Sequence, residues 1–247
     1  MCLLKSKYSW LVAPGLWLTG VLALIIVWGV ATPEWVQWHF DQDGASPVEV
    51  ATVGLFFAQI GILWLVPPMP PSHKRTLVLS LFSLITLFAI CRELDWHRLL
   101  VSTPNLPEMT RGTPFKLKYL TNSHNPLGSR LTVAACFLTA FGVCGGTLFY
   151  YLPRLLKGLF KFHPVCWSVA FLGGTCILSQ IFDRLPADLR HHCGVHLTAS
   201  QHALTTALEE GQELLLPLFV ILATLQAHFI YNNDPSDSSS LARHKDL

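Results

Sequence analysis

The chain has 247 residues, of which 51% are hydrophobic and 13% are charged, and its formal net charge is +2. The charged share is about half that of an ordinary soluble domain, which argues against a soluble protein and indicates lipid as the surrounding solvent. The small net charge, without any Lys/Arg-rich run, argues against a nucleic-acid partner.

Long apolar segments recur along the chain. Each approaches the ~20 residues that an α-helix needs to cross a hydrocarbon core of about 30 Å. An isolated segment in lipid can satisfy its backbone polar groups only as a helix. The segments cover residues 9–31, 48–67, 76–92, 131–152, 164–182 and 213–231. The sequence therefore predicts an all-α, polytopic membrane helix bundle of about six transmembrane helices.

The basic residues of the short loops predict the orientation of this bundle. Lys5, Lys7, Lys74 and Arg75 fall on one side of the predicted spans, which places both termini in the cytoplasm by the positive-inside rule. The outer-face loops are then 32–47, 93–130 and 183–212. Residues 1–231 form a single transmembrane helical domain, and the polar composition of 232–247 predicts a disordered cytoplasmic tail.

A cluster of titratable residues ends the third apolar segment, in "CRELDWHRLL". Glu93 and His97 are four residues apart and therefore share one face of a helix, while Arg92 and Asp95 can pair on a neighbouring face. A carboxylate and an imidazole at this spacing can chelate a metal ion, or the carboxylate can orient the imidazole as a base. The alternative is an interfacial helix end that is stabilised by two ion pairs.

Two further acidic residues enter the membrane at the same outer face. Glu49 follows the "DGASPV" turn at the start of the second span, and Asp183 ends the fifth. Each has a simpler interpretation, because a glutamate in a first helical turn is stabilised by the helix dipole and Asp183 can be a solvated helix end. Acidic residues at membrane depth are nevertheless functional candidates, since they are costly to keep there.

The segment before the sixth span, "SQHALTTALEEGQELLLPLF", contains the densest acidic group. His202, Glu209 and Glu213 fall along one stripe of a helix, and Glu210 is adjacent to it. Like charges at this spacing repel by a few tenths of a kcal/mol per pair, unless a cation or a proton lies between them. Pro217 is expected to kink this helix over the outer mouth of the bundle.

The histidines of "RHHCGVH" are more ambiguous. His192 and His196 are four residues apart, but Gly194 between them and the nearby Pro186 argue against a helix. Two histidines in a loop can bind zinc, yet the pattern favours a solvated loop.

Three of these segments resemble one group of proteins. "QDGASPVE", "CRELDWHRLL" and "ALEEGQE" are similar to the D-G-x-x-x-E, R-E-x-x-W and L-E-E-x-x-E motifs of uncharacterised polytopic inner-membrane proteins of bacteria, with one residue more before the glutamate of the first motif. The resemblance groups Glu49, Glu93, Trp96, Glu209 and Glu213 together and implies a bacterial inner membrane. It implies no particular activity.

The sequence therefore favours a metal-dependent hydrolase or transferase that acts on a membrane lipid or lipid-linked substrate at the outer face. Carboxylate and imidazole ligands suit Zn, Mn or Fe, and a bound ion would polarise the substrate and activate water. The expected metal ligands are Glu93, His97, His202 and Glu213, the expected catalytic groups are Glu49, Asp183 and Glu209, and the expected supporting residues are Arg92, Asp95 and Glu210. The alternative is a non-catalytic accessory subunit or a small cation- or proton-coupled transporter.

Overall fold

The computed structural model describes Leu4, Ser6 and residues 8–41, 46–66, 73–94, 120–121 and 125–233. Within these ranges the ordered elements are helices, and no strand occurs. Five of the helical segments are long and apolar enough to cross a membrane, namely Ser9–Val30, Pro47–Leu65, Arg75–Glu93, Pro164–Cys193 and Ala199–Ile230. The chain is thus an all-helical protein with the features of an integral membrane protein.

The chain divides into two compact units, one of Met1–Ser83 with Lys157–Leu247 and one of Leu84–Leu156. The helices of the first unit are α1 (Val12–Val30), α2 (Pro33–Phe40), α3 (Pro47–Leu65), α8 (Pro164–Cys193) and α9 (Ala199–Asn233). Helix α4 (His73–Glu93) leaves the first unit after Ser83, and α7 (Leu127–Phe160) returns to it at Lys157.

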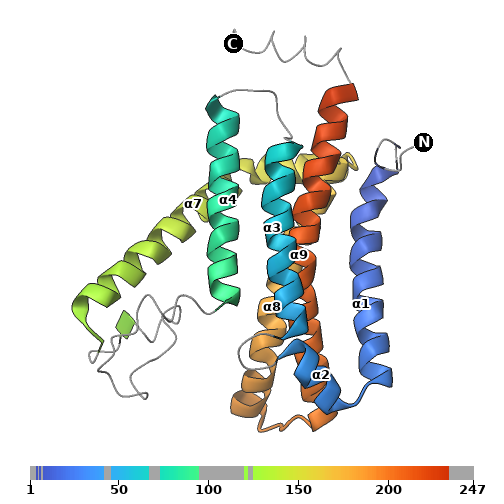
Figure 1. Ribbon diagram of the computed structural model, residues 1–247, viewed down its shortest axis with the longest axis vertical. Helices are drawn as coiled ribbons and strands as arrows, with labels where there is room; N and C mark the ends of the chain where they lie inside the picture. Colours follow the sequence, from blue (N-terminus) through green and yellow to red (C-terminus); the bar gives the residue numbers. More distant parts are fainter. Residues whose placement is uncertain are drawn as a thin grey trace. The chain divides into compact units, whose positions relative to one another are not determined.

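Helix α9 is the centre of the first unit (Figure 1). It packs against α8 most extensively and also against α1, α2 and α3. Of its most apolar stretch 39% is buried, against 6% for the first candidate span, so most of α1 is left for lipid to cover. The buried side chains of α9 are therefore positioned by several neighbouring helices.

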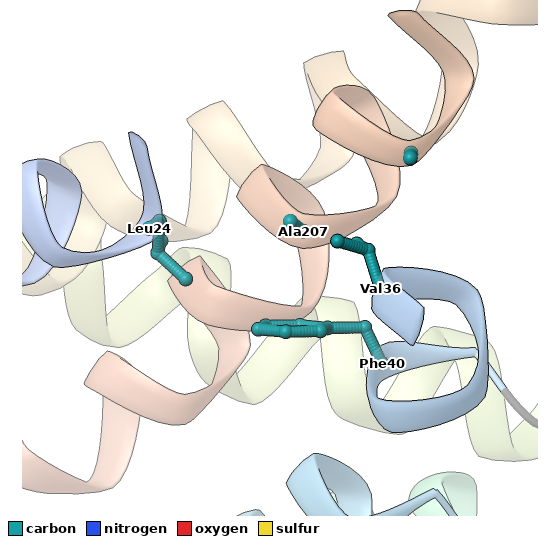
Figure 2. Close-up of a cluster of buried hydrophobic side chains, with 5 residues drawn as sticks. Leu24, Val36, Phe40 and Ala207 are labelled. Atoms are coloured by element: carbon teal, nitrogen blue, oxygen red, sulfur yellow. The ribbon is translucent and has the colours of Figure 1, made fainter. Parts of the chain in front are cut away.

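Helix α2 lies in the predicted outer loop 32–47 and closes one end of the unit. It begins at Pro33, whose missing N–H costs nothing in a first turn, and the Thr32 hydroxyl accepts a hydrogen bond from the Trp35 N–H at 3.3 Å. Figure 2 shows Val36 and Phe40 of α2 turned toward Leu24 of α1 and Ala207 of α9. This apolar cluster fixes α2 across the ends of its neighbours.

The predicted outer loop 183–212 needs correction, because both flanking helices extend far into it. Helix α8 continues through Pro186 to Cys193, and α9 starts at Ala199, so only residues 194–198 connect them. Gly194 ends α8 in the left-handed conformation, with φ of 66°, as glycine does at helix C-termini. Pro217 likewise lies inside α9, since packed neighbours make proline tolerable in membrane helices.

Other expectations stay predictions. The predicted fourth span, 131–152, lies within α7, where Leu127–Thr139 is a shorter apolar stretch. The span count of six and the orientation of the termini are therefore not established. Residues 95–119 of the predicted 93–130 loop, and 234–247 of the predicted tail, fall outside the described residues.

The close approach of α1 and α9 generates a first prediction. A Cβ added at Gly211 of α9 would collide with the Leu24 side chain of α1, which is itself buried. Gly211→Ala should therefore destabilise the protein by about 1–3 kcal/mol through overpacking, seen as a lower Tm in detergent. The matched control is Gly15→Ala in α1, where a Cβ meets open space, and it should leave Tm unchanged or slightly higher. Equal Tm values for both variants would contradict the packing.

Candidate functional site

A pocket of about 480 Å³ opens where α8 and α9 meet their short connection. Its walls come from the end of α2, from the last part of α8, from residues 194–198 and from the first part of α9. The polar side chains that line it are Asp41, Asp183, Arg190, His196, His202, Thr205, Thr206, Glu209 and Glu210. Four carboxylates, one guanidinium and two imidazoles thus share one cavity.

The hairpin geometry brings acidic residues of two helices to one level. Asp183 lies ten residues before the end of α8, and Glu209 lies ten residues after the start of α9. At a rise of 1.5 Å per residue, both are about 15 Å from the tip of the hairpin. Because the connection is short, the two helices run antiparallel and these carboxyl groups face the same pocket.

Glu213 continues this acidic column into the interior of the unit. It follows Glu209 by one helical turn and is only 4% exposed. Its Oε1 accepts a hydrogen bond of 2.9 Å from the Ser179 hydroxyl of α8. Carboxylate oxygens of Glu210 and Glu213 lie within 4.8 Å of each other. Glu210 lines the pocket, so this pair joins the pocket to the buried interface between α8 and α9.

The predicted stripe on α9 is therefore confirmed as helical. His202 and Glu209 line the pocket and Glu213 is buried next to it. Asp183 reaches the same pocket from α8. Carboxylates and imidazoles can hold a divalent cation or transfer protons, while Arg190 can bind a phosphate or carboxylate group.

Glu49 has a structural role that accounts for its position. Its carboxylate accepts a hydrogen bond from the Ser46 N–H at 2.7 Å, and the Ser46 hydroxyl accepts one from the Glu49 N–H at 3.1 Å. This is a capping box at the start of α3. The simpler interpretation of a first-turn charge is thus the one that the geometry supports, and a catalytic role for Glu49 stays a prediction.

The titratable cluster at the end of the third span is described only in part. Arg92 and Glu93 end α4 within the second unit, whereas Asp95 and His97 lie outside the described residues. Their expected roles as metal ligands or supporting groups therefore remain predictions.

Sequence reasoning did not select several residues that line the pocket or hold its acids. Arg190 follows Asp183 by seven residues, a spacing that returns to the same helix face, and this signal could have found it. Ser179 precedes Asp183 by four residues and could have been found in the same way. Asp41 and His196 reach the pocket through the placement of α2 and of the connection, which no local pattern gives.

No family model, curated protein or solved structure matches this chain. The motif resemblance to bacterial inner-membrane proteins therefore stays a prediction, and a functional assignment depends on the chemistry of the pocket.

The Ser179–Glu213 hydrogen bond generates a second prediction. Ser179→Ala removes a donor to a buried carboxyl group and should cost about 1.5–3 kcal/mol, the range for hydrogen bonds to charged groups. Ser168→Ala is the matched control, because the Ser168 hydroxyl is equally buried but donates to the neutral Gln226 side chain at 2.7 Å. Its cost should be about 0.5–1.5 kcal/mol. Thermal unfolding compares the two, and a larger loss for Ser168→Ala would contradict a stronger hydrogen bond at Glu213.

Proposed function

We propose that the protein is a metal-dependent membrane hydrolase or transferase acting on a lipid or lipid-linked substrate, with the α8–α9 pocket as its site. The observation that supports this most is the Glu210–Glu213 pair, whose carboxylate oxygens lie within 4.8 Å of each other. Divalent cations bind protein oxygens at about 2.0–2.6 Å. One ion between the two oxygens could therefore contact both.

The pocket offers the remaining groups that such a reaction needs. His202 lies eight residues before Glu210 in α9, or about 12 Å along the helix axis, so it can exchange a proton with a substrate in the pocket but is too far away to be a third ligand of this ion. Zn, Mn or Fe would each accept carboxylate ligands. A bound cation would polarise an ester or phosphoryl oxygen and lower the pKa of a water molecule. Glu209 and Asp183 are placed to accept and return a proton, and Arg190 to hold an anionic group of the substrate.

The position of the pocket on the candidate spans favours a lipid substrate. Helix α8 has 30 residues, or a length of about 45 Å, whereas the hydrocarbon core is about 30 Å thick. The end of α8 that carries the pocket therefore extends into the headgroup region when the helix spans a bilayer. Lipid headgroups are the polar substrates that are most concentrated at this depth.

A second candidate function is cation- or proton-coupled transport. The residues of α8 that the structure describes as buried are Ser168, Thr175 and Ser179, three hydroxyl groups inside an apolar candidate span. Polar groups inside membrane helices often mark an ion or proton pathway. This observation favours transport over an accessory role, although the open pocket with its convergent charges favours catalysis over both.

Metal analysis of the purified protein tests the proposed enzyme. The wild-type protein should retain about one divalent ion, and Glu210→Gln should reduce the bound metal at least tenfold because it removes one of two close carboxylate ligands. The same preparations, incubated with vesicles of zwitterionic and anionic phospholipids, should release a metal-dependent product that mass spectrometry detects.

Glu34→Gln serves as the control, because Glu34 is an exposed acid in the first turn of α2. It should retain both metal and turnover. A wild-type protein that binds no divalent metal and leaves all lipids intact would refute the enzyme and favour the accessory subunit or the transporter. A similar metal loss in both variants would show that the ion is held nonspecifically by surface charge.

A further inference from the structure

The buried face of α8 is a row of hydroxyl groups turned toward α9. Ser168, Thr175 and Ser179 are separated by seven and four residues, so they share one helix face. Ser168 donates to Gln226 and Ser179 donates to Glu213, and both acceptors are on α9. This face of α8 therefore contacts α9. Thr175 lies between Ser168 and Ser179 and is one helical turn from Ser179.

The two hydrogen bonds also set the level of Thr175 against α9. The helices are antiparallel, and interpolation between the Ser168–Gln226 and Ser179–Glu213 pairs places Thr175 level with Pro217. Pro217 is fully buried and has no N–H, so it cannot donate to the Glu213 carbonyl one turn earlier. The α9 ladder therefore lacks the hydrogen bond that residue 217 would otherwise give to this carbonyl.

Thr175 is unusual among the buried threonines of the first unit. Its side chain is 1% exposed, and its Oγ1 has no hydrogen-bond partner within the described part of the chain. Thr52 and Thr224, by contrast, donate to the carbonyl four residues earlier in their own helices, at 2.9 and 2.8 Å. An unpaired buried hydroxyl costs about 1–3 kcal/mol, which a ligand at this position would offset.

We propose that Thr175, Ser179 and Glu213 form a binding site for a monovalent cation, Na⁺, at the Pro217 position of α9. Two hydroxyl oxygens, the Glu213 carbonyl and one carboxylate supply the all-oxygen surroundings that a hard cation prefers. Interrupted backbone hydrogen bonding in a membrane helix is where Na⁺ sites are commonly formed. This Na⁺ site differs from the proposed divalent site between Glu210 and Glu213, although Glu213 belongs to both.

The test measures how Na⁺ affects the stability of the detergent-solubilised full-length protein. Tm should rise as Na⁺ replaces N-methylglucamine at constant ionic strength, since a ligand that binds only the native state stabilises it. Thr175→Val keeps the side-chain shape but removes the oxygen, and it should weaken the apparent Na⁺ affinity by roughly tenfold or more. Thr224→Val is the control and should keep the wild-type Na⁺ response, because its hydroxyl is already paired within α9.

Two results would overturn the site. One is a wild-type Tm that does not respond to Na⁺, which would leave a bound water as the partner of Thr175. The other is a Thr175→Val protein that is more stable than wild type in every salt and keeps the full Na⁺ response. Should Thr175→Val fail to fold, Thr175→Ser decides, because it retains the oxygen and must retain Na⁺ binding.

Glu210→Gln separates this inference from the proposed enzyme. It should lose the divalent ion and keep the Na⁺ response, whereas Thr175→Val should lose the Na⁺ response and keep the divalent ion. The monovalent site is refuted if both ions are lost in Glu210→Gln and neither is lost in Thr175→Val.

Discussion

The pairing of polar side chains between α8 and α9 is the constraint on which the first unit depends. Hydrocarbon offers no hydrogen-bond partners, so a polar side chain within a candidate span must find its partner on another helix or its own. Ser168 with Gln226 and Ser179 with Glu213 meet this requirement, and the Trp17 indole of α1 does so by donating to Gln212 at 3.1 Å. These bonds fix the register of the helices more tightly than apolar contacts, which tolerate sliding.

That register determines where the pocket forms. Because Ser179 is held against Glu213, the residues one turn nearer the hairpin tip, Asp183 and Glu209, arrive at one level and line the same cavity. The apolar cluster of Leu24, Val36 and Phe40 then holds α2 close enough for Asp41 to join them. A buried hydrogen bond thus positions an exposed group of charges about one helical turn away.

The sequence predicted what periodicity and composition determine. Apolar runs located five helices that can span a membrane, and spacings of seven and four residues correctly placed His202, Glu209 and Glu213 on one stripe of a helix. The sequence analysis ended α8 too early and left too long a loop before α9. Pro186 and Gly194 are local helix-breaking signals, whereas packing against α9 stabilises α8 beyond Pro186. Arg190 and Asp41 join the site through tertiary packing, and Glu49 shows the converse, since its Ser-x-x-Glu context specifies a cap.

Glu213 is the residue whose position is hardest to explain by structure alone. A carboxyl group buried among membrane helices lowers stability unless its charge is compensated, and a glutamine of nearly the same shape could accept the Ser179 hydrogen bond without that cost. Gln212 and Gln226 show that this chain uses neutral amides where a hydrogen bond is all that is needed. An acid at position 213, between a charged pocket and an unpaired hydroxyl at Thr175, therefore favours a requirement for negative charge. The proposed Na⁺ site would account for such a requirement.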